Sequence, residues 1–208
     1  MKTDTKYILT GTRLYFVLVA IILLWAAYTT IFTLHPSDTI SANIELIPGI
    51  IGITVLLIAG FTPEQCYLRL APISKPGLVV LISFTLALIP ILMTGKWVGW
   101  SWLPVLIYAP ASGVAQELFF RSSLLPVLIR IFKTKNLTAV FVHAILFTLW
   151  HVPLAFTKAP IPGAIAVTIV TFIGGMAWGW QVQRDRTVYW AMIQHIAYLM
   201  VMSLFIWE

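Results

Sequence analysis

The stretch LPVLIYAPASGVAQELFFRSSLLPVLIRIF, Leu103–Phe132, decides the fold class, because it is long and apolar yet carries Glu117 and Arg121 in its middle. A helix that crosses a bilayer needs about 20 consecutive, mostly apolar residues. Over the whole chain of 208 residues, 60% are hydrophobic and 10% are charged, against about 45–50% and about 25% in soluble domains. This composition excludes a soluble enzyme, a disordered chain and a nucleic-acid-binding module.

Six further stretches with few or no charges lie on either side of this one. We therefore expect an all-α, polytopic transmembrane helix bundle of about seven spans, with a polar cavity inside the membrane. The predicted spans are Leu14–Leu34, Leu46–Phe61, Gly77–Thr94, Leu103–Phe132, Leu137–Thr157, Ile161–Gln183 and Val188–Trp207.

Basic residues are unevenly distributed between the connections of these spans. With alternating spans and a cytoplasmic N-terminus, 10 of the 13 Lys and Arg residues fall inside, 2 (Lys96 and Lys158) fall outside, and Arg121 lies within a span. Such a bias marks the cytoplasmic side of membrane proteins, so it predicts an N-terminus inside and a C-terminus outside. The inside residues are Lys2, Lys6, Arg13, Arg69, Lys75, Arg130, Lys133, Lys135, Arg184 and Arg186.

The fourth span is too long for one regular crossing. From Trp97 to Phe132 there are 36 residues, which would make a helix of about 54 Å at 1.5 Å per residue. We expect Pro104, Pro110 and Gly113 to break it, so that the helix proper starts near Ala111.

Glu117 and Arg121 are the charged residues that this helix would carry into the membrane. A charge at the centre of a bilayer costs at least about 2.5–3.5 kcal/mol, so such residues usually mark a functional site. At positions i and i+4 the two share a helix face and can pair, which also allows a purely structural ion pair. Gln116 adds a third polar group on the same turn.

Two later spans each contribute a histidine. His151 ends the segment Phe147-Thr-Leu-Trp-His151, with His143 two turns before it, and His195 follows Gln194 in the last span. A lone histidine on an apolar helix is most often a core residue. A buried Glu/Arg helix together with two histidine-bearing helices points instead to a shared site.

One carboxylate and two imidazoles can hydrolyse a peptide bond. Glu117 would deprotonate a water that His151 positions, and His195 would donate to the oxyanion. Alternatively, Glu117, His151 and His195 could be three zinc ligands with a fourth position open for water. No His-Glu-x-x-His motif supports that alternative, so we expect no cofactor. The single Cys66 excludes an intramolecular disulfide and a cysteine-rich metal site.

At these residues the chain resembles the CPBP intramembrane protease family, also called the Abi or CAAX prenyl protease-like family. The family pattern is Glu-Glu-x-x-x-Arg, then Phe-x-x-x-His, then His-x-x-x-Asn/Asp, each on its own membrane helix. Here Gln116–Arg121 reads Gln-Glu-Leu-Phe-Phe-Arg, Phe147–His151 matches the second motif, and the glycine-rich stretch Gly174–Thr187 leads into His195. The resemblance covers roughly Leu103 to Phe205.

The chain departs from the family pattern at two positions. Gln116 stands where the family has the glutamate that is usually given the water-activating role, and Leu199 stands at the position of the Asn/Asp. Tyr198, beside Leu199, is a candidate substitute. Either Glu117 is the base of a variant site, or the protein is a catalytically inactive relative that binds or scaffolds membrane proteins. A third hypothesis is a small transporter or channel whose polar path is lined by Glu117 and Arg121.

The resemblance implies a membrane-embedded endopeptidase, glutamic-type or metal-dependent, with catalytic residues Glu117, His151, His195, Arg121 and Gln116. Residues 1–102 would form N-terminal transmembrane helices and residues 103–208 the catalytic core of one integral membrane domain. The expected partners are the lipid bilayer and a membrane-associated protein or peptide substrate, such as a C-terminal sorting tail or a bacteriocin-type precursor, and no nucleic acid. The short loops favour a bacterial inner-membrane protein.

Overall fold

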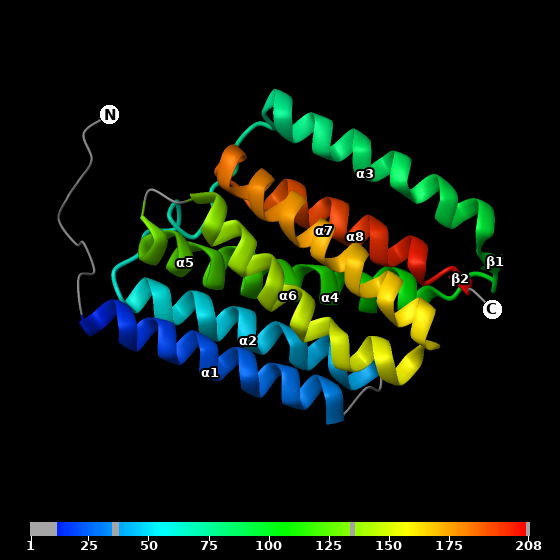
Figure 1. The fold of residues 1–208 in the computed structure, drawn as a ribbon, viewed down its shortest axis with the longest axis horizontal. Coiled ribbons are helices and arrows are strands. Elements are labelled where there is room, and N and C mark those ends of the chain that lie inside the picture. Colours follow the sequence, from blue (N-terminus) through cyan, green and yellow to red (C-terminus); the bar gives the residue numbers. More distant parts are fainter. Residues whose placement is uncertain (1–11, 35–37, 134–135, 207–208) are drawn as a thin grey trace.

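The computed structural model describes residues 12–34, 38–133 and 136–206. Within these residues the helices form seven rods that run alternately in opposite directions (Figure 1). Six rods are single helices: α1 (Thr12–Leu34), α2 (Asp38–Ile58), α3 (Lys75–Thr94), α6 (Asn136–Lys158), α7 (Ile161–Asp185) and α8 (Tyr189–Met202). The fourth rod is composite and consists of η1 (Pro104–Tyr108), α4 (Ala109–Gln116), η2 (Glu117–Leu124) and α5 (Leu125–Phe132).

The all-helical prediction is confirmed, and two of its boundaries are wrong. The second rod begins at Asp38 rather than Leu46. The prediction followed the apolar residues alone, whereas the backbone hydrogen bonds of a helix also continue through the polar residues before them. The last rod ends at Met202. Beyond it, Phe205–Ile206 (β2) pairs antiparallel with Lys96–Trp97 (β1), and the Trp97 and Phe205 rings meet edge to face at 5.4 Å.

The expected break in the fourth span is also wrong, because helix continues from η1 to the end of α5. Two π-helical segments absorb the irregularity. The Ala109 N–H donates to the Pro104 carbonyl, five residues back, and this wider turn accommodates the missing N–H of Pro110 just after it. Gly113 serves a different purpose: a Cβ there would lie 2.7 Å from Ile196 Cγ1 of α8, so glycine allows α4 and α8 to approach closely.

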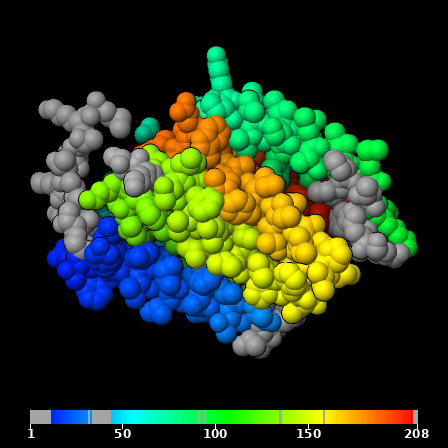
Figure 2. Space-filling model, in the orientation of Figure 1, coloured from blue at the N-terminus to red at the C-terminus, as the bar shows by residue number. Residues whose placement is uncertain are grey.

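The molecule has an apolar exterior and a polar interior. Phe16 is 70% exposed, Ile58 83% and Met93 79%, whereas Glu117 and Arg121 are 0% exposed. On the face shown in Figure 2, the side chains of α1, α6 and α7 cover the interior. A soluble protein would bury the first group and expose the second. This inverted distribution suits a lipid environment.

Three helices in the described part of the chain are long and apolar enough to cross a membrane. They are Thr12–Ile31, Asn136–Thr157 and Ile161–Asp185, while the apolar parts of α2 and α3, Ile44–Ile58 and Lys75–Ile89, are shorter. The chain is therefore a membrane protein. A total of seven spans stays a prediction.

The connections that carry most of the basic residues meet at one end of the bundle. The start of α1, the α2–α3 connection, the end of α5 and the end of α7 lie together there, and β1 with Lys96 lies at the other end (Figure 1). The basic residues placed at the first end are Arg13, Arg69, Lys75, Arg130, Lys133, Arg184 and Arg186. Lys2, Lys6 and Lys135 of the predicted inside set lie outside the described residues.

The composite rod occupies the centre, and this position brings the site together. On one side α4 and η2 pack against α2; on another, α4 packs against α8. The rod's end, α5, contacts α6, which in turn makes the most extensive helix contact with α7. Helices from both predicted regions, residues 1–102 and 103–208, thus share one interior, and the boundary between those regions stays a prediction.

Candidate active site

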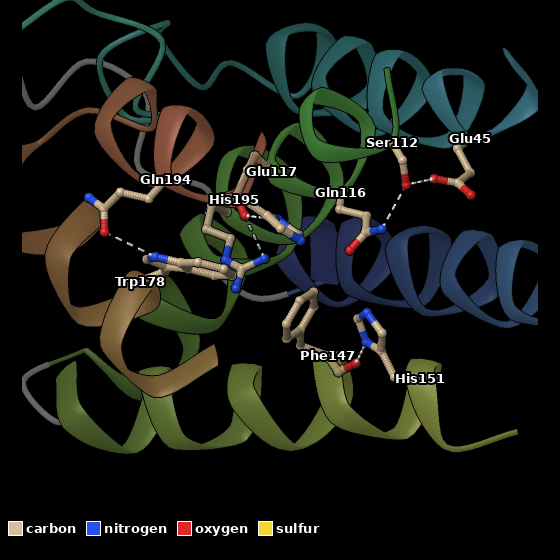
Figure 3. A network of polar contacts seen from close by, with 10 residues as sticks. Glu45, Ser112, Gln116, Glu117, Phe147, His151, Trp178, Gln194 and His195 are labelled. Carbon is tan, nitrogen blue, oxygen red and sulfur yellow. Dashed lines mark hydrogen bonds and ion pairs between the residues drawn. The ribbon is translucent and has the colours of Figure 1, made fainter. Parts of the chain in front are cut away.

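Glu117 is the centre of a buried cluster of three ionisable side chains. Its Oε1 atom lies 3.0 Å from Arg121 Nη1 and 2.8 Å from His195 Nδ1 (Figure 3). Glu117 and Arg121 are one turn apart on η2, as the i and i+4 spacing predicted, and His195 comes from α8. The other carboxylate oxygen, Oε2, is buried and has no hydrogen-bond partner among the described residues.

Arg121 is held by aromatic rings as well as by the carboxylate. Its guanidinium carbon lies 4.0 Å from the ring centroid of Phe147 on α6 and 5.5 Å from that of Trp178 on α7. Cation–π contacts strengthen when both groups are desolvated. Phe147 of the sequence motif therefore serves as a support for the arginine and joins α6 to the cluster.

His195 is oriented by a chain of side-chain hydrogen bonds that sequence reasoning missed. Its ring stacks on Trp178 with centroids 4.6 Å apart. Trp178 Nε1 donates to Gln194 Oε1 at 3.2 Å, Gln194 Nε2 donates to Gln181 Oε1 at 3.0 Å, and Gln181 Nε2 donates to the Gly77 carbonyl at 3.4 Å. The sequence did contain a signal for this chain, namely two glutamines, Gln181 and Gln194, inside neighbouring predicted spans.

His151 lies on the other side of the same aromatic support. Its Nδ1 atom donates to the Phe147 carbonyl at 2.8 Å, and its ring meets the Phe147 ring edge to face at 4.6 Å. The Phe147 ring is also 6.1 Å from the ring of His195. The two histidines are thus neighbours of one residue, although no hydrogen bond joins His151 to Glu117 among the described residues. In the neutral ring, donation from Nδ1 leaves Nε2 as an acceptor.

His143 is fully buried and makes no hydrogen bond to the Glu117 cluster. Its ring is parallel to that of Phe147 at 6.4 Å, and neither nitrogen has a hydrogen-bond partner among the described residues. Gly179 of α7 gives it room, since a Cβ there would lie 3.1 Å from His143 Nδ1.

Gln116 points into a second polar group, which includes a carboxylate that the sequence did not single out. Gln116 Nε2 donates to Ser112 Oγ at 2.9 Å, and Ser112 Oγ donates to Glu45 Oε2 at 2.5 Å. Glu45 is 3% exposed and comes from α2. It directly precedes the span predicted from Leu46, so a boundary extended by one residue would have revealed an intramembrane carboxylate.

Two further polar side chains on these helices have ordinary partners. Tyr198, the candidate substitute beside Leu199, packs edge to face against Phe84 of α3 at 5.7 Å. Ser123 Oγ donates to the Leu118 carbonyl within η2.

The zinc alternative requires Glu117, His151 and His195 to converge on one ion. Among the described residues, no three His, Cys, Asp or Glu side chains are gathered closely enough to hold a metal ion. The donor set does not fit zinc as it stands, because His195 points its Nδ1 at Glu117 rather than at a shared centre.

Cys66 lies in the α2–α3 connection, where burial raises the pKa of its thiol to about 11, so this thiol stays protonated at neutral pH.

Comparisons with known proteins agree with the motif resemblance. No curated protein and no solved structure matches the chain. Residues 98–201 match the family described as "Type II CAAX prenyl endopeptidase Rce1-like". The matched half contains the Glu117–Arg121 pair, both histidines and the tryptophan on which His195 stacks. The chain therefore belongs to this Rce1-like family of intramembrane CAAX-type proteases.

Proposed function

We propose that this protein is an intramembrane endopeptidase that hydrolyses a peptide bond in a membrane-associated protein or peptide by means of a water activated by Glu117. One observation carries the proposal: Arg121 and His195 both engage Glu117 Oε1, while Oε2 has no partner in the described part of the chain. A carboxylate held on one oxygen and free on the other can take a proton without losing its position.

In the proposed reaction, Glu117 Oε2 accepts a proton from water and the water oxygen bonds to the peptide carbonyl carbon. His151 Nε2 accepts a hydrogen bond from the second hydrogen of the same water, which stays on the oxygen, because Nδ1 already donates to the Phe147 carbonyl. The tetrahedral intermediate then collapses, the C–N bond breaks, and Glu117 passes its proton to the leaving nitrogen. The carboxylate is regenerated and no covalent intermediate forms.

His195 is proposed to donate to the oxyanion through Nε2, since Nδ1 faces Glu117. In this role the ring donates from both nitrogens, so it acts as an imidazolium. Arg121 pairs with Glu117 Oε1 and fixes the rotamer of the carboxylate. Glu117 is fully buried, so the proposal also requires movement of the surrounding helices to admit the substrate.

The test compares wild type with Glu117→Gln, an isosteric change that removes the base. Bacterial membranes are incubated with each purified protein, and new peptide termini are mapped by mass spectrometry. The expected result is a set of termini made by wild type and lost with Glu117→Gln, at a rate at least about 10²-fold lower. C-terminal sorting tails and bacteriocin-type precursors are the proposed substrates. Identical termini in both samples would refute the proposal and favour an inactive scaffold.

A chelator separates the proposed glutamic-type mechanism from a zinc-dependent one. Activity should persist in excess EDTA or 1,10-phenanthroline. Loss with either chelator and recovery with zinc would overturn the role proposed for Glu117.

We place the protein in the bacterial cytoplasmic membrane with its N-terminus inside. The gathering of Arg130, Lys133, Arg184 and Arg186 at one end of the bundle supports this orientation. In a cysteine-free background, Lys133→Cys should react with an impermeant maleimide only after cell lysis, and Lys96→Cys in intact cells. The reverse pattern would invert the topology.

A further inference from the structure

Glu45 has no part in the mechanism above, yet it is a buried carboxylate connected to the site. It lies on α2, far from Gln116 in sequence, and Ser112 of α4 bridges the two (Figure 3). Tyr28 of α1 also hydrogen-bonds the Glu45 carboxylate. Within the described residues, no basic side chain is paired with this carboxylate. A buried carboxylate without a counterion is costly unless its oxygens are hydrogen-bonded.

The direction of the hydrogen bonds follows from the chemistry of the middle residue. A serine hydroxyl has one hydrogen to donate and lone pairs to accept with. Because Ser112 donates its hydrogen to the Glu45 carboxylate, it can only accept from Gln116, which must therefore turn its NH₂ group toward Ser112. Gln116 Oε1 then points the other way. That oxygen is buried and has no hydrogen-bond partner among the described residues.

We propose that Glu45 is a positioning residue that, through Ser112, holds the Gln116 amide with its carbonyl oxygen toward the peptide bond to be cleaved. The inference rests on the proposed function. Held in this way, the Gln116 side chain always presents a hydrogen-bond acceptor to the substrate. Without Glu45 the amide could rotate and present a donor instead.

The group that Gln116 Oε1 accepts from follows by elimination. In the proposed reaction the attacking water transfers one proton to Glu117 Oε2 and donates a hydrogen bond from its other hydrogen to His151 Nε2. The remaining donor at the reacting centre is the N–H of the scissile peptide. Its nitrogen gains a proton as the C–N bond breaks, so an acceptor beside it is worth more in the transition state than in the bound substrate. Gln116 lies next to Glu117 in the chain, and in Figure 3 its amide oxygen is on the side of Phe147 and His151.

The first experiment breaks the Glu45–Ser112–Gln116 chain of hydrogen bonds, called the relay below, at different points. Glu45→Ala and Ser112→Ala should each lower kcat about tenfold, as expected for losing one oriented hydrogen bond. The double variant should lose no more than either single one, because both break the same chain. Glu45→Gln keeps an acceptor for Ser112 and should lose less than Glu45→Ala. Thr54→Ala, on the exposed side of α2, is the matched control. Additive losses would overturn the relay.

The second experiment repeats Glu45→Ala in a Gln116→Glu background, where the residue at 116 has two acceptor oxygens and needs no orienting. Ser112 then has one hydrogen between two carboxylates, so removing Glu45 should raise kcat rather than lower it. A purely structural role for Glu45 predicts the same loss in both backgrounds. That outcome would refute the proposal.

A spectroscopic measurement separates failure of this inference from failure of the proposed function. In protein labelled with ¹⁵N-glutamine, the side-chain amide signals of Gln116 are those absent from Gln116→Glu. They should shift in Glu45→Ala and stay unchanged in Thr54→Ala. Unshifted signals overturn the relay whatever the activity. Shifted signals in a protein without Glu117-dependent cleavage support the relay and refute the peptidase.

Discussion

The buried interior contains two carboxylates that are stabilised in different ways. Glu117 is met by the Arg121 guanidinium, with Nη1 at 3.0 Å, and by the His195 ring, with Nδ1 at 2.8 Å. Glu45 is met by the neutral hydroxyl of Ser112, with the Gln116 amide behind it. The first cluster lies in the half of the chain that carries the family match, and Glu45 lies outside it.

This difference determines how much stability is lost when each carboxylate or its partner is substituted. Removing one member of a buried ion pair leaves the other charge uncompensated, so the loss exceeds the value of the pair itself. A carboxylate that only accepts hydrogen bonds from neutral groups can be replaced by an amide of the same shape. Variants in the two clusters should therefore differ strongly in stability and activity.

The largest effect is expected for Arg121→Met, which leaves the Glu117 carboxylate buried without its cation. The free energy of unfolding should fall by about 3–5 kcal/mol. Urea titration in detergent micelles, followed by tryptophan fluorescence, measures it. The double variant Arg121→Met/Glu117→Gln should recover most of the loss, because no charge is left unpaired. A single variant as stable as wild type would contradict the ion-pair account.

His195→Ala should act on rate more than on stability. Losing one oxyanion donor typically lowers kcat about 10²–10³-fold, and cleavage of a substrate identified by terminus mapping would measure it. His143→Leu is the matched control, because His143 is buried on the same aromatic support without touching Glu117. Equal losses in both variants would show that the histidines matter only for packing.

Gly113→Ala tests the close approach that joins the two clusters, since Gly113 follows Ser112 and contacts α8 next to His195. The new Cβ would lie 2.7 Å from Ile196 Cγ1, and overpacking of this kind costs about 1–3 kcal/mol. At Gly174 the nearest atom, in the Trp178 ring, would be 3.7 Å away. There alanine should stabilise the helix by about 0.5–1 kcal/mol. The same urea titration compares the two, and equal effects would contradict the packing argument.

The smallest effect is expected for Glu45→Gln. The amide oxygen can still accept from Ser112, so the free energy of unfolding should change by no more than about 1 kcal/mol. A loss as large as that of Arg121→Met would mean that Glu45 is paired with a charge, and the contrast between the two carboxylates would disappear.

Much of the fold and part of the site could be predicted from sequence for local physical reasons. Apolar run length indicates membrane helices, and the i, i+4 spacing of Glu117 and Arg121 places them on one helix face whatever surrounds them. The break expected at Pro104 and Pro110 is absent because π-helical turns accommodate a residue without an N–H inside a continuous helix. A single sequence does not distinguish such a turn from a break.

Sequence alone determined the class of molecule, the ionisable residues that had to be buried, and the motif that indicated the family. These follow from composition and from helix geometry, which act within a few residues. Only the tertiary structure decided that His195 contacts Glu117, that Phe147 supports Arg121, and that Glu45 reaches Gln116 through Ser112. Contacts of this kind depend on how each helix is rotated and shifted against its neighbours, and that is set by packing such as Gly113 against Ile196 across distant parts of the chain.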